Sequence, residues 1–303
     1  MSYTSWRKLS LVFWWIIPIP IFLIYLLSIV NTANILVCNK IPSIGTTISS
    51  ATNRDKQTKV FVLAGQSNMA GRGGVKEDKI WDGFVPQECY PNPSILRLNT
   101  YLTWVEAREP LHHDIDSNKT CGIGPGLVFA NKILEKDLGK KMNNNNIGLV
   151  PCAVGGTSLS EWGRGSKLYN DLIMRTRAAM EDDDDDEEGR RILEGILWFQ
   201  GERDTISREE AESYRTKLEI LIQDFRNDLQ SPNLPFFQVL LASAQGPFMD
   251  TVREAQVGIN LPNVICVDAM GLPLQPDGLH LSTLAQVHLG EMLADAFLDF
   301  RST

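Results

Sequence analysis

The chain has 303 residues, of which 43% are hydrophobic, so it can bury one large core or two small ones. Its formal net charge is −8 at pH 7, and the acidic run Glu181–Glu188 supplies that whole excess. Because the remainder is near neutral, no basic surface for a nucleic-acid partner is expected.

The N-terminal part contains an uncharged segment over residues 9–30, LSLVFWWIIPIPIFLIYLLSIV, which is long enough to cross a bilayer. Arg7 and Lys8 precede it. The positive-inside tendency therefore predicts a single-pass signal anchor, with residues 1–8 cytosolic and the remainder lumenal or extracellular. The alternative is a signal peptide cleaved near residues 32–33, which would release a secreted protein. Its apolar region would be shorter, however, at roughly 7–15 residues.

Residues 31–57 are polar and Ser/Thr-rich, which is typical of a flexible stem, and one domain is expected over residues 58–303. In that domain, apolar runs typical of strands alternate with segments of helical periodicity. Strands are expected at residues 60–64, 147–153, 192–199, 236–242 and 264–269. Helices are expected at residues 125–139, 169–180, 207–229, 247–261 and 282–300. Five strands joined by crossover helices predict an α/β fold with a five-stranded parallel sheet covered on both faces.

The five cysteines show neither C-x-x-C spacing nor a Cys/His cluster, so no metal site and no disulfide-dense scaffold are predicted. Cys152 and Cys266 lie in apolar strand-like runs and are expected to be buried free thiols. Cys89 and Cys121 lie in loop-like segments. If the domain is lumenal, these two are the candidates for a disulfide.

Polar or glycine-rich segments follow four of the predicted strands. Ser67 follows the first strand, and residues 155–158, 200–204 and 277–280 come after later ones. Because the carboxyl ends of parallel strands meet at one edge of a sheet, we expect these segments to converge. Ser67 alone is also compatible with a helix cap or a turn, which are common roles of serine, and it lacks the second Gly of a G-x-S-x-G motif. A catalytic role therefore depends on a base elsewhere.

A base and its partner are available at the same edge. A serine hydroxyl is a weak nucleophile until a positioned base, most often a histidine, takes its proton. Of the four histidines, His280 lies at this edge, and Asp277 is close enough in sequence to orient its ring. The backbone N–H of Gly155 and the side-chain amide of Gln200 are candidate donors to a developing oxyanion.

Four segments, GQSNMAGRGG, CAVGGTSLSEW, WFQGERDT and DGLHLS, together resemble the SGNH (GDSL-like) hydrolase superfamily. Within it, they are most similar to the sialate O-acetylesterase-like domain of carbohydrate esterase family 6, which includes plant probable carbohydrate esterases. The resemblance covers residues 59 to about 300. It implies a flavodoxin-like three-layer α/β/α sandwich and a serine esterase that removes O-acetyl groups from a glycan without a metal or cofactor.

The resemblance also implies roles for individual residues. The nucleophile would be Ser67, the base His280 and the orienting acid Asp277. The oxyanion donors would be the backbone N–H groups of Ser67 and Gly155, with the side chain of Gln200. Candidate substrate contacts beside these motifs are Gln66, Asn68, Glu202 and Trp162.

Two alternative functions are open. A catalytically idle carbohydrate-binding protein would keep the polar edge without turnover, but the intact Ser67, Asp277 and His280 argue against decay of the site. An esterase or thioesterase acting on a non-sugar acyl ester would keep the same residues. No apolar lid segment indicates that alternative.

Overall fold

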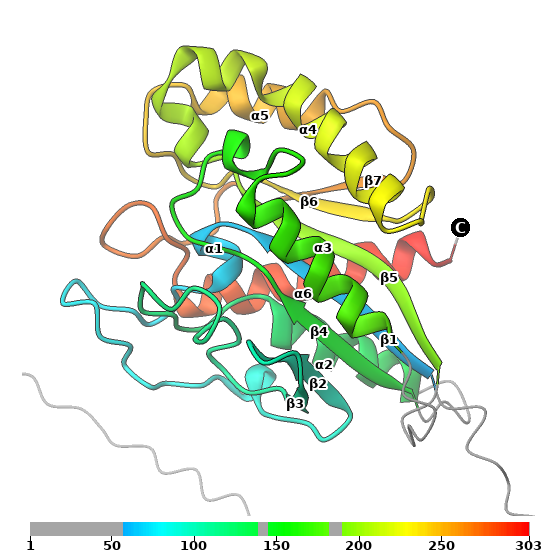
Figure 1. Ribbon diagram of the computed structural model, residues 1–303. Coiled ribbons are helices and arrows are strands. Elements are labelled where there is room, and N and C mark those ends of the chain that lie inside the picture. The colour runs from blue at the N-terminus through cyan, green and yellow to red at the C-terminus, as the bar shows by residue number, and fades with distance from the viewer. Residues whose placement is uncertain (1–56, 139–144, 182–189, 303) are drawn as a thin grey trace, which may run out of the picture. The chain divides into compact units, whose positions relative to one another are not determined.

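The computed structural model describes residues 57–138, 145–181 and 190–302 (Figure 1). The predicted cytosolic tail, membrane anchor and stem, residues 1–56, lie outside the described residues. Within the described ranges, no helix combines the length and apolar character needed to cross a membrane. The first strand of the described part begins at Gln57.

A seven-stranded sheet, in the order β3-β2-β4-β1-β5-β6-β7, forms the centre of the described part. Its strands are β1 (Gln57–Gly65), β2 (Ile95–Leu98), β3 (Trp104–Glu106), β4 (Asn146–Pro151), β5 (Arg190–Phe199), β6 (Phe236–Leu240) and β7 (Val264–Asp268). All neighbouring strands are parallel except β2 and β3. The α/β class is confirmed, but the prediction of five strands is wrong. β2 and β3 have only four and three residues, too few for a periodic pattern to reveal them.

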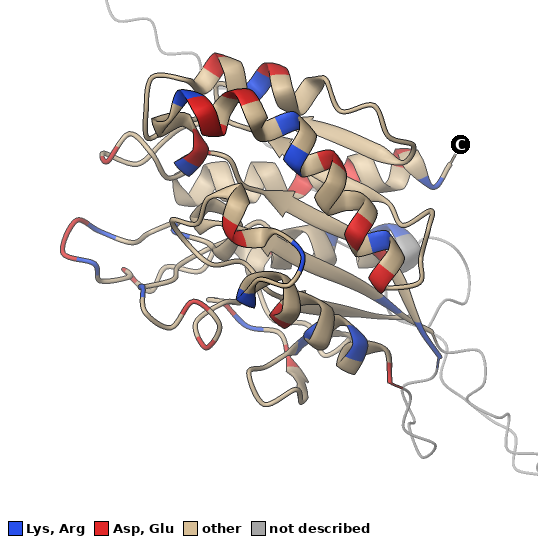
Figure 2. Cartoon of the chain, turned by 45° about the horizontal axis from the view of Figure 1, so that its top comes forward, with Lys and Arg blue, Asp and Glu red and all other residues tan. Residues whose placement is uncertain are grey.

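Helices cover both faces of this sheet (Figure 1). One face carries α2 (Gly126–Leu138) and α6 (Thr283–Phe300), and the other carries α3 (Lys167–Met180), α4 (Arg208–Asp228) and α5 (Met249–Val257). All five expected helices are present, although α5 ends before its predicted end at residue 261. Charged residues lie mainly in helices and loops, while the strands are largely uncharged (Figure 2).

The core is packed on both faces of the central strands. Val60 to Ala64 of β1 are fully buried, as expected for an apolar strand at the middle of a sheet. On one face, Phe61 meets Phe129 of α2 edge-on, with ring centroids 4.8 Å apart. On the other face, Trp198 of β5 packs against Phe225 of α4. Each aromatic pair contributes about 0.5–1.5 kcal/mol beyond the area that it buries.

Serine caps determine where three of the helices begin. The hydroxyls of Ser166, Ser207 and Ser282 each accept the backbone N–H three residues later, at the starts of α3, α4 and α6. Such a cap stabilises a helix by about 1 kcal/mol, because it satisfies an otherwise unpaired donor. Ser282 lies two residues after His280, so the cap of α6 also anchors one loop of the candidate site.

The cysteine predictions are wrong in two respects. Cys89 and Cys121 are both buried and free, so the predicted pair is not formed. Cys266 is exposed rather than buried, because β7 is the last strand of the sheet and lacks a neighbour on its outer side. Cys152 is buried and free, as predicted.

Candidate active site

The strand β1 ends in a glycine that brings Ser67 to the edge of the sheet. Gly65 has φ of +122°, and a Cβ atom there would lie 2.1 Å from the carbonyl oxygen of Phe199. Only glycine accommodates this turn and this close approach. The chain continues directly into the single turn α1 (Ser67–Ala70). Among the described residues, the backbone N–H of Ser67 has no hydrogen-bond acceptor.

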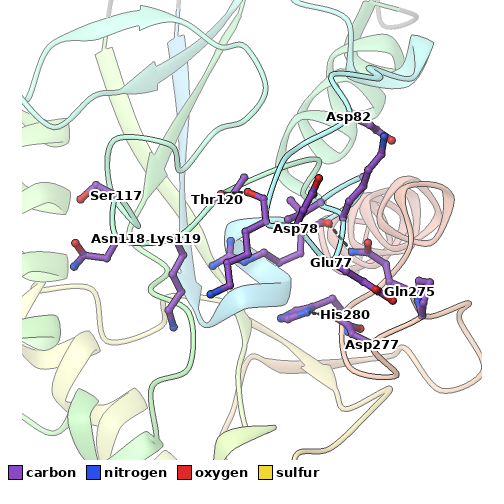
Figure 3. Close-up of a pocket in the computed structure, with 16 residues that line it drawn as sticks. Glu77, Asp78, Asp82, Ser117, Asn118, Lys119, Thr120, Gln275, Asp277 and His280 are labelled. Carbon is purple, nitrogen blue, oxygen red and sulfur yellow. Dashed lines mark hydrogen bonds and ion pairs between the residues drawn. The ribbon is translucent and has the colours of Figure 1, made fainter.

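The loop after β7 brings a histidine and an aspartate to the same place. Nε2 of His280 lies 2.9 Å from Oγ of Ser67, and Nδ1 lies 2.6 Å from Oδ2 of Asp277. The second oxygen of Asp277 accepts the backbone N–H groups of Leu279 and His280, at 2.9 and 3.0 Å. Nδ1 carries the ring proton and donates a hydrogen bond to the carboxylate of Asp277. The unprotonated Nε2 can therefore accept a hydrogen bond from the Ser67 hydroxyl. Figure 3 shows His280 and Asp277 side by side at the cavity wall.

The protonation states in this trio suit a neutral base beside an ionised acid. Burial lowers the pKa of His280, and Arg72 and Lys119 lower it further, against the opposing effect of Asp277. Partial burial alone would raise the pKa of Asp277. Its hydrogen bonds from two backbone N–H groups and from His280 outweigh that effect, so its pKa is lowered. At neutral pH the imidazole is therefore free to accept a proton.

Gly155 lies in the loop after β4, where its backbone N–H already has an acceptor. It donates to Oδ2 of Asp116 at 3.1 Å, and the same oxygen forms a buried ion pair with Arg72. A Cβ atom at position 155 would lie 2.6 Å from Nη2 of Arg72. The carbonyl oxygen of Gly155 accepts a 2.6 Å hydrogen bond from Nζ of Lys119. An oxyanion role for this N–H therefore requires that it exchange the carboxylate for a substrate oxygen.

Gln200 is fully buried, and its amide is engaged away from Ser67. Nε2 donates to Oδ2 of Asp204 at 2.5 Å and to the carbonyl oxygen of Thr157 at 3.0 Å. Oε1 accepts the hydroxyl of Tyr214 at 2.9 Å. Both amide protons are thus used, so the geometry does not support the predicted role as a direct oxyanion donor. Gln200 instead supports the loop that carries Gly155.

The four predicted substrate contacts are inaccessible. The side chains of Gln66, Asn68, Glu202 and Trp162 are each 0% exposed. Trp162 packs edge-on against Trp198, and its indole N–H donates to the hydroxyl of Thr157 at 3.1 Å. These predictions are wrong because closeness to a motif in the sequence does not reveal on which side of a loop a side chain lies.

A cavity of about 1270 Å³ opens beside His280 (Figure 3). Its walls come from residues 72–82, 117–120 and 275–280. The charged lining residues are four cations, Arg72, Lys76, Lys79 and Lys119, and four acids, Glu77, Asp78, Asp82 and Asp277. The volume exceeds that of typical small-ligand pockets, roughly 300–1,000 Å³. Residues 75–82 carry a charge pattern typical of an ordinary solvated turn, so the sequence does not mark them as a cavity wall.

Among the residues that the structure describes, no three His, Cys, Asp or Glu side chains come together in a way that could hold an ion.

Comparison with known proteins points to one family. The family model for carbohydrate esterase, sialic acid-specific acetylesterase, matches residues 57–299. A probable carbohydrate esterase of Arabidopsis thaliana is 50% identical over 245 residues, which cover 79% of this chain and 90% of that protein. A probable 9-O-acetyl-N-acetylneuraminic acid deacetylase of Escherichia coli (strain K12) is 27% identical over 147 residues, 42% of either chain.

Solved structures agree with this result. The X-ray structure of an Arabidopsis thaliana protein matches with a TM-score of 0.74 and 48% identity, covering 81% of this chain and 98% of that one. The crystal structure of NanS matches with a TM-score of 0.64 and 20% identity, over 82% of this chain and 98% of that one. At that identity, the second likeness concerns the fold alone.

Proposed function

The chain belongs to the family of sialic acid-specific acetylesterases among the carbohydrate esterases and is an ester hydrolase, and from this premise we propose that it deacetylates a carbohydrate through an acyl-enzyme formed on Ser67. The observation that carries the mechanism is the hydrogen-bonded chain from Ser67 through His280 to Asp277, with links of 2.9 and 2.6 Å. A nucleophile, its base and a group that orients the base are the parts that covalent ester hydrolysis needs.

The reaction divides into two half-reactions. Oγ of Ser67 attacks the acetyl carbonyl carbon while Nε2 of His280 takes the hydroxyl proton, and Asp277 stabilises the resulting imidazolium. The tetrahedral intermediate then breaks its bond to the sugar oxygen, which receives the proton from His280. A water molecule, deprotonated by His280, next attacks the acetylated serine. Acetate leaves, and Ser67 regains its proton from His280.

The oxyanion of these intermediates needs donors beside Ser67. The backbone N–H of Ser67 is the first donor, because it lies at the end of β1 without an acceptor among the described residues. The N–H of Gly155 is the second, once it exchanges Asp116 for the substrate oxygen. In this proposal Gln200 acts indirectly, by holding the loop between Gly155 and Thr157.

The cavity beside His280 supports a bulky polar substrate. Most of the residues that line it carry charged or polar groups, and it has room for more than one sugar ring. The named relatives, a probable carbohydrate esterase and a probable deacetylase of an acetylated sugar, favour an acetylated carbohydrate.

The test uses the purified full-length protein with three substrates: an acetylated polysaccharide, p-nitrophenyl acetate and a long-chain p-nitrophenyl ester. We expect release of acetate from the polysaccharide, turnover of the short ester and little turnover of the long one. Absence of any turnover would favour the idle carbohydrate-binding alternative. A preference for the long acyl chain would favour an esterase of non-sugar substrates.

For the cellular setting we propose a single-pass protein whose catalytic domain is lumenal or extracellular. The support is the pattern of Arg7 and Lys8 ahead of the uncharged segment over residues 9–30. Cleavage of that segment would instead yield a secreted enzyme.

A further inference from the structure

The residue that follows the nucleophile holds the backbone on both sides of the proposed base. Oδ1 of Asn68 accepts the backbone N–H of Leu281 at 2.9 Å, and Nδ2 donates to the carbonyl oxygen of Leu279 at 3.4 Å. His280 is the residue between these two. The side chain of Asn68 therefore ties the loop of the nucleophile to the loop of the base.

Glu202, in the loop after β5, reinforces the orientation of the Asn68 amide that the contacts with Leu279 and Leu281 also require. Its Oε1 accepts from Nδ2 of Asn68 at 2.7 Å. The oxygen and nitrogen of a side-chain amide can be exchanged by a flip, but the acceptor Oε1 of Glu202 requires that Nδ2 of Asn68 face it. Oδ1 is then directed to the N–H of Leu281. Oε2 of Glu202 has no partner among the described residues, so Oε1 remains an acceptor even when the carboxyl is protonated on Oε2.

Further hydrogen bonds hold the backbones of Asn68 and Glu202 in place. The carbonyl oxygen of Asn68 accepts from Nε2 of Gln286 in α6 at 3.0 Å. The carbonyl oxygen of Glu202 accepts from the hydroxyl of Thr205 at 2.7 Å and from the backbone N–H of Gln245 at 3.2 Å. The contact between Asn68 and Glu202 thus joins two loops that are each anchored independently.

Burial separates this contact from substrate binding. Asn68 and Glu202 are both 0% exposed, so neither side chain reaches the cavity. Burying a carboxyl group is costly, and burial raises the pKa of Glu202 to about 7. Among the described residues, Asn68 is the one side-chain partner of this carboxyl. A costly buried carboxyl whose side-chain partner is Asn68, next to the base, is what a positioning role predicts.

We propose that Asn68 and Glu202 are a positioning pair that fixes His280 against Ser67, an inference that rests on the proposed serine mechanism. The pair acts through the backbone of residues 279–281 rather than on the substrate. A displacement of about 1 Å in a reacting group can cost about 10²-fold in rate. Since neither side chain contacts the substrate, the loss appears in kcat and leaves KM unchanged.

The test compares Glu202→Gln with Glu202→Leu in the full-length protein, with p-nitrophenyl acetate as substrate. Both changes remove the buried charge and approximate the size of glutamate, but only glutamine keeps an acceptor for Asn68. We expect Glu202→Gln to retain kcat within about threefold and Glu202→Leu to lose about 10- to 100-fold, each with KM within about twofold. Because the two residues act as a unit, Asn68→Ala combined with Glu202→Leu should cost no more than the worse single change.

Two controls separate positioning from other effects. Phe225→Leu, in the core between α4 and β5, destabilises the fold without touching the site, and its kcat should stay near that of the wild type. Ser67→Ala gives the background of the assay. If Ser67→Ala is inactive while Glu202→Leu keeps wild-type kcat, or raises KM alone, the positioning inference fails and the serine mechanism stands. If Ser67→Ala remains active, the serine mechanism itself fails.

Discussion

Nε2 of His280 lies 2.9 Å from Oγ of Ser67, although 213 positions separate the two residues in the chain. The contact exists because β1 is central in the sheet and the loop after β7 returns to the carboxyl end of β1 before α6 begins. The catalytic roles of the two residues stay predictions, and the following experiments test them.

Replacing Ser67 by alanine removes the one oxygen that can form the acyl-enzyme and hardly alters the shape of the site. We expect kcat for p-nitrophenyl acetate to fall by at least about 10³-fold. An acetylated oligosaccharide should still bind in calorimetry, because the cavity walls are unchanged. Substantial residual turnover would show that another residue is the nucleophile.

The pH dependence of kcat/KM should report the protonation of His280. The imidazole must be neutral to accept the serine proton, and its pKa in the folded protein is lowered by burial. Activity should therefore fall on acidification with a midpoint below about 6.5, the value for a free histidine. A profile measured between about pH 4 and pH 8 decides the matter. A midpoint above the free value would mean that Asp277 outweighs burial, and a flat profile would exclude a histidine base.

Substitution of Gly155 by alanine tests the second oxyanion donor. The new Cβ atom would lie 2.6 Å from Nη2 of Arg72, which Asp116 holds, so the loop has to shift. We expect kcat to fall by about 10- to 100-fold with a small change in KM. Gly163→Ala is the matched control, since its Cβ meets only the Ser160 carbonyl, at 3.6 Å. Equal kinetics for the two variants would remove Gly155 from the mechanism.

Glu202 should make the stability of the protein depend on pH. Its pKa is about 7 in the folded protein, against an ordinary value of 4.5, so folding takes up a proton between these values. Its contribution to stability therefore decreases as the pH rises through this window, by up to about 3 kcal/mol. Glu202→Gln cannot titrate, so its Tm should fall less between pH 5 and pH 8 than the wild-type Tm. Glu109, whose pKa is also raised, remains in both proteins and cancels in the comparison. Parallel Tm curves would contradict the raised pKa of Glu202.

The topology proposal is tested in sealed membrane vesicles. If residues 9–30 span the bilayer with Arg7 and Lys8 on the cytosolic side, the domain after residue 57 resists added protease until detergent is present. If the domain is protected in sealed vesicles but is released in soluble form when they are opened, the segment over residues 9–30 has been cleaved. Digestion without detergent would place the domain on the cytosolic side.

Local sequence patterns were enough to predict the features that depend on neighbouring residues. The apolar run from Val60 to Ala64 predicted a buried central strand, and the helical periodicity over residues 207–229 predicted the helix α4; the structure confirms both. The sequence also selected Ser67 and His280, because parallel strands present their carboxyl ends at one edge and few residue types can do this chemistry.

Which groups face the cavity and which are engaged elsewhere depends on contacts between distant parts of the chain, and local patterns do not predict these contacts. Gln200 and Gly155 are at the expected places, but their N–H groups are held by Asp204 and Asp116, from other parts of the chain. Glu202 looked like a substrate contact and is instead fully buried against Asn68. The physical reason is that a strand pattern predicts where a residue lies in the fold. The direction of its polar groups depends on residues from distant parts of the chain that compete for the same hydrogen bonds.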